Sequence, residues 1–141
     1  MNLAIEQGRL AQRCNEVPVG AILVDPEGNV KQSSHNLVIR NSDPTSHAEM
    51  NVIRQECASI KNERLRHYRL FVTLEPCPMC ASAISLARIS KVYYGASDNK
   101  SGGVELGPKI FSHSQTHHKP KIIKGINEDI CSIMLKKFFK A

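Results

Sequence analysis

Residues 70–96 have the sequence LFVTLEPCPMCASAISLARISKVYYGA. Residues 70–74 are an apolar run of strand length that ends at Glu75-Pro76, and a helix is predicted from Met79 to Arg88. A second strand is predicted over residues 91–96. Two strands joined by a helix favour parallel neighbours in a sheet that helices cover on both faces. This segment therefore predicts an α/β fold.

The chain before residue 70 adds two helices and a hairpin. The apolar run 17–24, the turn residues 25–29 and the stretch 30–36 predict two antiparallel strands. An amphipathic helix is predicted over residues 2–14, with a buried stripe of Leu3, Leu10, Ala11 and Cys14. A second helix is predicted to start after Asp43-Pro44-Thr45-Ser46, with one face made of Met50, Ile53, Cys57 and Ile60.

The chain after residue 96 begins with a long polar loop. A short strand is predicted over residues 121–126, and Asn127 is predicted to cap a last helix that ends in Phe138-Phe139. The opening hairpin makes the predicted sheet mixed, because its two strands run antiparallel.

Length and composition indicate one globular domain over residues 1–141. The chain has 141 residues, of which 41% are hydrophobic and 23% charged, which are ordinary values for a folded domain. It has no apolar run of the roughly 20 residues that a membrane span needs, and no export signal at its start. The five cysteines are an odd number, which argues against a disulfide framework. We expect a soluble, cytoplasmic protein with no membrane partner.

The strongest chemical signal is the combination of His47-Ala48-Glu49 with Cys77-Pro78-Met79-Cys80. One imidazole and two thiolates are three good zinc ligands, and they leave a fourth tetrahedral position for water, as in catalytic zinc sites. Both motifs fall at predicted helix starts, where the positive end of the helix dipole favours thiolates. The sequence therefore predicts a zinc site made of His47, Cys77 and Cys80.

Glu49 is the predicted catalytic acid and base. Residues two apart on an ideal helix point about 200° from each other, so His47 and Glu49 share a site only if His47 lies in the irregular entry turn. Glu49 then takes a proton from the zinc-activated water and passes it to a leaving group. A structural zinc site with His67 or Cys57 as its fourth ligand is the alternative.

The combined motifs resemble those of zinc-dependent nucleobase deaminases, and the chain most resembles bacterial tRNA-specific adenosine deaminases. This resemblance implies conversion of adenosine to inosine at the first anticodon position of a tRNA, with zinc-activated water attacking C6. It also implies a cytidine deaminase-like α/β/α sandwich with a five-stranded mixed sheet, one zinc ion per subunit, and a homodimer that binds the anticodon stem-loop. The motifs that carry it include residues 16–21, 35–36, 43–49, 72–80, 88–89, 95–102, 125–126 and 138–139.

The resemblance also implies substrate-binding residues. Asn36 matches the residue that hydrogen-bonds the flipped base, Val17 and Pro18 match the pocket wall, and Asp98 and Lys100 match the loop that contacts neighbouring nucleotides. The backbone N–H groups of Ala48 and Cys77 are expected to face the reacting group.

The positive charge of the chain is concentrated near its end. Residues 109–141 contain 7 lysines and two acidic residues, within a net charge of +6 for the whole chain. This segment also holds His113, His117 and His118, and it suits RNA phosphates. Phe138 is the predicted stacking residue, because lysines flank Phe138-Phe139. A solvated helix face with a buried phenylalanine is the alternative for this segment.

Two other functions fit parts of the pattern. A deaminase of a free base or nucleotide shares the zinc residues but does not need the basic C-terminal segment. A non-catalytic, zinc-stabilised RNA-binding module has no use for Glu49.

Overall fold

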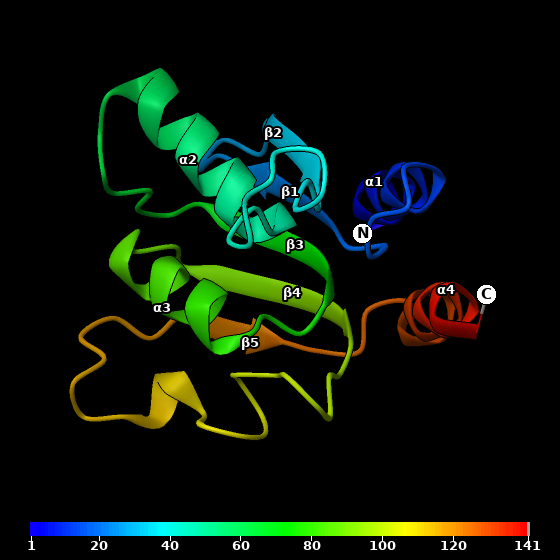
Figure 1. Ribbon diagram of the computed structural model, residues 1–141. Coiled ribbons are helices and arrows are strands. Elements are labelled where there is room, and N and C mark those ends of the chain that lie inside the picture. Colours follow the sequence, from blue (N-terminus) through cyan, green and yellow to red (C-terminus); the bar gives the residue numbers. More distant parts are fainter. Residues whose placement is uncertain (141) are drawn as a thin grey trace.

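The computed structural model describes residues 1–140 and has three layers, with a central sheet between two pairs of helices (Figure 1). In this part of the chain the sheet has five strands in the order β2-β1-β3-β4-β5. Strand β1 pairs antiparallel with β2 and β3, whereas β3, β4 and β5 run parallel. The strands are β1 (Gly20–Val24), β2 (Val30–His35), β3 (Arg69–Leu74), β4 (Lys91–Ala96) and β5 (Lys121–Ile123). The predicted sandwich with a mixed sheet is confirmed.

Each face of the sheet is covered by two helices. Helices α2 (Ala48–Ile60) and α3 (Pro78–Leu86) lie on one face, and α1 (Asn2–Arg13) and α4 (Glu128–Lys140) lie on the other (Figure 1). The larger apolar core lies between the sheet and the pair α2 and α3; its fully buried side chains include Val52, Leu70, Val72, Ile84 and Tyr94. Within residues 1–140, no helix is both long and apolar enough to cross a membrane.

Helix α1 forms where it was predicted, but it buries a different face. Of the predicted stripe only Ala11 is buried, while Leu3 is 49% and Leu10 40% exposed. The residues that are buried along α1 are Ala4, Ile5, Gly8 and Ala11. Small residues are needed here because α1 packs directly on β1: a Cβ atom on Gly20 would lie 1.9 Å from the Ala4 carbonyl oxygen.

Several predicted boundaries move because the backbone turns earlier or later. Strand β1 begins at Gly20 instead of residue 17, because Pro18 has no N–H for a ladder and the Val19 N–H donates to the Val17 carbonyl at 2.7 Å. Helix α3 ends at Leu86, before Arg88 takes a positive φ of 63°. Strand β5 stops at Ile123, just before the chain turns at Gly125.

The predicted face of α2 is only partly right. Ile53 is buried, Met50 and Cys57 are half-buried, and Ile60 is 40% exposed. Glu56 is fully buried in their place, because its carboxylate accepts hydrogen bonds from the Tyr68 hydroxyl and the Gln32 amide. A polar side chain with two partners is thus part of the packed face of this helix.

Candidate metal centre and active site

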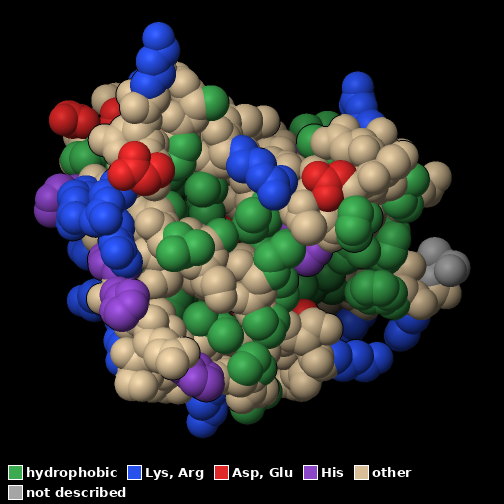
Figure 2. Space-filling view, turned by 60° about the vertical axis from the view of Figure 1, so that its left-hand side comes forward, with side chains coloured by type: hydrophobic (Ala, Val, Ile, Leu, Met, Phe, Trp, Pro, Cys, Tyr) green, Lys and Arg blue, Asp and Glu red, His purple; other side chains and the backbone are tan. Residues whose placement is uncertain are grey.

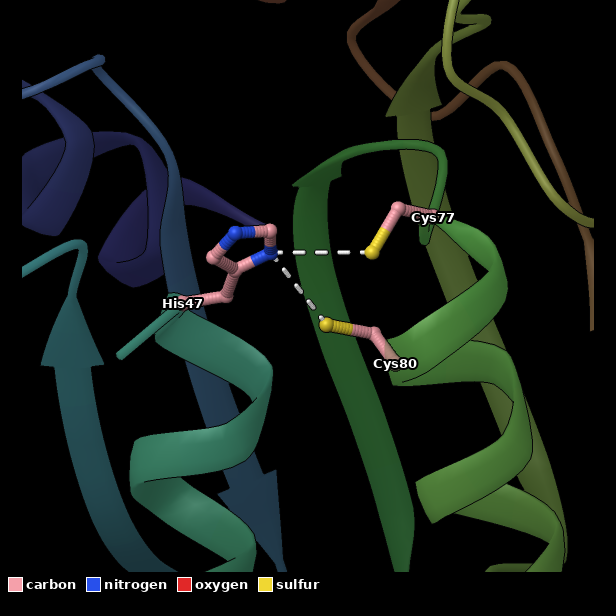
Figure 3. Close-up of side chains that lie close together, drawn as sticks. All are labelled: His47, Cys77 and Cys80. Carbon is pink, nitrogen blue, oxygen red and sulfur yellow. Dashed lines mark hydrogen bonds between the residues drawn. The ribbon is translucent and has the colours of Figure 1, made fainter. Parts of the chain in front are cut away.

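The site lies where the N-terminal ends of α2 and α3 meet beside the carboxyl end of β3 (Figure 3). His47 is the N-cap of α2 and Cys77 is the N-cap of α3, and both have extended backbone. Pro78 occupies the first turn of α3, where its missing N–H has no helical partner to lose. His47 therefore lies in the entry turn, which is the condition under which His47 and Glu49 can face one site.

Three side chains converge between the two helices. The His47 Nδ1 atom lies 3.6 Å from the Cys77 sulfur and 3.5 Å from the Cys80 sulfur (Figure 3). A tetrahedral zinc ion with normal Zn–S and Zn–N bonds would hold nitrogen and sulfur about 3.6 Å apart. Their ligand atoms all lie within 4.8 Å of one another, and among residues 1–140 neither His67 nor Cys57 joins the cluster. The donor set fits a zinc site with three protein ligands.

The two thiols and the His47 ring shift one another's pKa values. A hydrogen bond from Cys80, together with one from His47, lowers the pKa of Cys77 to about 4 against the opposing effect of burial. The same hydrogen bond and burial raise the pKa of Cys80. The hydrogen bond to Cys77 also raises the pKa of His47. Cys77 is therefore a thiolate at neutral pH, which is the form that binds a metal ion.

Glu49 lies in the first turn of α2 and is only 3% exposed. Burial raises the pKa of its carboxyl group to about 7, so the group can both accept and donate a proton near neutral pH. Glu49 lines a cavity of about 170 Å³ together with His47, Cys77 and Asn36. The acid and two of the three candidate metal ligands, His47 and Cys77, thus face the same small space.

The side chain of Asn36 is held in one orientation. Its Oδ1 accepts a hydrogen bond from the Ala48 N–H at 2.8 Å, so its Nδ2 group is the part that can donate to a substrate. The Ala48 N–H, which is predicted to face the reacting group, donates its hydrogen to Asn36 in this structure, so its contact with a substrate stays a prediction. The Cys77 N–H, at the start of α3, also stays a predicted backbone donor.

The predicted pocket wall is partly in place. Val17 lines the cavity, whereas Pro18 is buried and does not line it. Sequence reasoning missed four further residues that line the cavity, which are Val19, Leu74, Glu75 and Ser101.

A groove of about 440 Å³ adjoins the cavity and shares Val17, Leu74, Asp98 and Ser101 with it. Its other lining residues include Lys100, Lys136 and Phe139. The face in Figure 2 has a hollow surrounded by hydrophobic side chains, with Lys and Arg side chains at the periphery. Asp98 lies where the cavity meets the groove, and Lys100 lies in the groove.

The structure places Phe139, and not Phe138, in the lining of this groove. Phe139 is 69% exposed, whereas Phe138 is half-buried and packs edge to face against it, with 5.2 Å between ring centroids. A sequence of two adjacent phenylalanines carries no signal for which of them faces the groove.

Most of the basic C-terminal segment lies outside the groove lining. Lys136 lines the groove, whereas Lys124 pairs with Glu105 at 3.3 Å. The His113 ring contacts the Pro108 carbonyl, and the His118 ring hydrogen-bonds the Ile89 carbonyl at 2.6 Å. Two of the three histidines therefore hold their own loop in place.

Known proteins that are similar to this chain include zinc-binding deaminases. Residues 1–96 match the family described as the cytidine and deoxycytidylate deaminase zinc-binding region. Over 140 residues the chain is 46% identical to the tRNA-specific adenosine deaminase of Agrobacterium fabrum, with 99% of this chain and 91% of that protein covered. The chain belongs to the tRNA-specific adenosine deaminases of this zinc-binding family. Zinc is accordingly the cofactor of this protein, and His47, Cys77 and Cys80 are its candidate ligands.

Other relatives agree with this family. The tRNA-specific adenosine deaminase of Bacillus subtilis is 38% identical over 140 residues, covering 99% of this chain and 86% of that protein. A structure from a study of tRNA:A34 deaminases, which edit A to I at the wobble position, has a TM-score of 0.94 at 46% identity and covers 96% of this chain and 97% of that one. A guanine deaminase from Nitrosomonas europaea has a TM-score of 0.79 at 16% identity, covering 99% of this chain and 82% of that one, which shows the shared fold alone.

Proposed function

We propose that this protein hydrolyses adenosine to inosine at the first anticodon position of a tRNA. The observation that carries the proposal is that the cavity with Glu49 opens into a groove lined by Lys100, Lys136 and Phe139. Single-stranded RNA is bound by basic side chains that contact phosphates and by aromatic rings that stack on bases. A cavity for one base beside such a groove suits a nucleotide that has been flipped out of an RNA loop.

The metal, held by His47, Cys77 and Cys80, supplies a Lewis acid that makes water a nucleophile near neutral pH. Glu49 would accept one proton from the water and pass it to N1 of the purine as oxygen adds to C6. It would then carry the remaining hydroxyl proton to the amino group, so that ammonia leaves and inosine keeps the proton on N1. Burial raises the pKa of this carboxyl group in the metal-free protein, which suits a group that must donate a proton as well as accept one. The Nδ2 group of Asn36 donates a hydrogen bond to the base, and the Val17 side chain contacts its ring.

The groove favours RNA over a free base as the substrate. A free base or nucleotide needs the cavity with Glu49 but gains little from Lys136 and Phe139, which lie beyond it. A non-catalytic RNA-binding module would not need a carboxyl group buried beside three metal ligands. Incubation with an anticodon stem-loop distinguishes the free-base deaminase and the RNA-binding module from the proposed enzyme.

We also propose that the molecule is one domain that acts as a homodimer in the cytoplasm. A single sheet that carries all four helices of residues 1–140 supports the single domain. The resemblance to the family supports the dimer, and Leu86 on α3, which is 73% exposed, offers an apolar contact for a second copy. Sedimentation of the purified protein is expected to give the mass of a dimer; a monomer at all concentrations would contradict this part.

The function is tested by incubating the zinc-loaded protein with an anticodon stem-loop that has adenosine at the first anticodon position, followed by nucleoside analysis. Inosine is expected at that position, and no product from free adenosine or guanine. Glu49→Gln is expected to lower kcat by about 10²- to 10⁴-fold while zinc stays bound.

Glu56→Gln is the matched control, because Glu56 is also buried in α2 but lies outside the cavity. Turnover of free bases with no response to the stem-loop would replace the proposal with the free-base alternative. RNA binding without any inosine would favour the binding module.

A further inference from the structure

Glu75 is a buried acid that borders the catalytic cavity, but no step of the proposed chemistry uses its carboxyl group. It follows β3, two residues before Cys77, and it is 2% exposed. Its Oε1 accepts the Asp98 N–H at 3.0 Å, and its Oε2 accepts the N–H groups of Val104 at 3.1 Å and Glu105 at 2.9 Å. One carboxylate thus binds three backbone groups from a loop that is more than 20 positions away along the chain.

The contact requires a carboxylate. Three N–H donors surround the two oxygens, and an amide in the same place would turn its own N–H₂ group toward at least one of them. A buried donor left without an acceptor is unfavourable. The loop also closes tightly over the acid: a Cβ atom on Gly102 would lie 2.5 Å from Oε2 of Glu75. The three donors and the close backbone of Gly102 therefore both fit two acceptor oxygens at this place.

The loop held by Glu75, residues 97–105, forms one wall of the substrate site. Asp98 and Ser101 line the catalytic cavity, and Lys100 joins them in the groove. The Asp98 carboxylate in turn accepts the N–H groups of Lys100 and Ser101 at 3.1 and 3.0 Å. Asp98 thus positions Lys100 and Ser101, which would contact the RNA, and Glu75 in turn positions Asp98.

The same loop is fastened to the segment that carries the metal ligands. The Gly103 N–H donates to the Pro76 carbonyl at 2.9 Å, and a Cβ atom on Gly103 would lie 2.6 Å from the Pro78 nitrogen. Glu75 and Cys77 therefore belong to one short segment. Glu75 holds the loop of residues 97–105, and Cys77 is a candidate ligand of the metal.

We propose that Glu75 is a positioning residue for the RNA substrate. Its carboxylate holds residues 97–105 against the turn that contains Cys77. This inference rests on the proposed function. It makes Glu75 a residue that sets the affinity for the anticodon loop and leaves the proton transfers of Glu49 and the zinc ligands unchanged.

The test compares Glu75→Gln with the wild type in zinc-loaded protein. KM for the anticodon stem-loop is expected to rise about tenfold or more, while kcat changes by less than about threefold. The dissociation constant of the stem-loop, measured by fluorescence anisotropy, is expected to rise by the same factor as KM, and the zinc content is expected to stay at the wild-type level. An unchanged dissociation constant, or a loss confined to kcat, would overturn the inference.

A second variant acts on the same contact from the loop side. Gly102→Ala places a methyl group against the Glu75 carboxylate and is expected to raise KM in the same way, so the inference stays testable if Glu75→Gln does not fold. In amide exchange experiments the N–H groups of Asp98, Val104 and Glu105 are expected to lose protection in both variants. Protection equal to that of the wild type would count against the inference.

Glu56→Gln is the control for a buried acid as such, because Glu56 is fully buried and bonded to the Tyr68 hydroxyl at 2.6 Å, outside the substrate site. It is expected to lower the free energy of unfolding and leave KM unchanged. If the wild-type protein makes no inosine, the proposed function fails. If it makes inosine and Glu75→Gln matches its KM, only the role of Glu75 fails.

Discussion

Replacing Phe139 by alanine is expected to weaken RNA binding without unfolding the protein. The ring is 69% exposed and lines the groove beside Lys136, so its removal takes little apolar area out of the core. Stacking of one base on an aromatic ring contributes about 1–3 kcal/mol. The dissociation constant of the anticodon stem-loop is therefore expected to rise by about 5- to 150-fold.

The assay is fluorescence anisotropy of a labelled stem-loop with the zinc-loaded protein, together with the midpoint of urea unfolding. Ile133→Ala is the matched control, because Ile133 is on the same helix and 51% exposed but does not line the groove. Phe138→Ala is expected to have the smaller effect on binding. A larger effect of Phe138→Ala, or an unchanged dissociation constant for Phe139→Ala, would refute the placement of the groove.

Three further predictions concern stability. Burial holds the pKa of Glu49 at about 7 instead of 4.5, so the folded metal-free protein binds this proton more tightly than the unfolded chain and loses about 3 kcal/mol of stability as the pH rises through this range. Urea unfolding of chelated protein should therefore find Glu49→Gln more stable than the wild type at pH 8 and nearly equal at pH 4; a pH-independent difference would contradict this. Tyr68→Phe removes the hydroxyl that donates to Glu56 at 2.6 Å and is expected to lower the free energy of unfolding by about 1.5–3 kcal/mol, with unchanged KM; a change in KM would count against it. Gly20→Ala would bring a Cβ atom to within 1.9 Å of the Ala4 carbonyl and is expected to lower stability by about 1–3 kcal/mol or more, whereas an unchanged melting temperature would show that α1 can move away from β1.

The order of the elements was predictable from sequence because it depends on local patterns. Strand β4 forms over the predicted residues 91–96, and the segment around Cys77 does connect two parallel strands through a helix. The entry turn at His47 was also predictable, since helix geometry allows His47 and Glu49 to face one site in no other way.

The parts that sequence missed depend on contacts between distant segments. The buried face of α1 is set by the close approach of Gly20 to Ala4, which periodicity within residues 2–14 cannot show. The choice between Phe138 and Phe139 depends on how α4 is rotated on the sheet.

Two buried acids that hydrogen-bond the backbone of distant loops were missed for the same reason. Glu16 accepts the N–H groups of Ile39 and Arg40, and Glu75 accepts those of residues 98, 104 and 105. An acid that bonds backbone groups 20 or more residues away leaves no periodic trace in the sequence. The signal that was present is an acidic side chain directly after the apolar strand 70–74.

The central claim is that His47, Cys77 and Cys80 form a zinc site with three protein ligands. X-ray absorption at the zinc edge, combined with metal analysis of the purified protein, tests it most directly. We expect about one zinc per chain, with two sulfurs at about 2.3 Å and a nitrogen at about 2.0–2.1 Å, and loss of this signal in Cys80→Ala. A protein purified without zinc, or a zinc site with no sulfur ligands, would contradict the account.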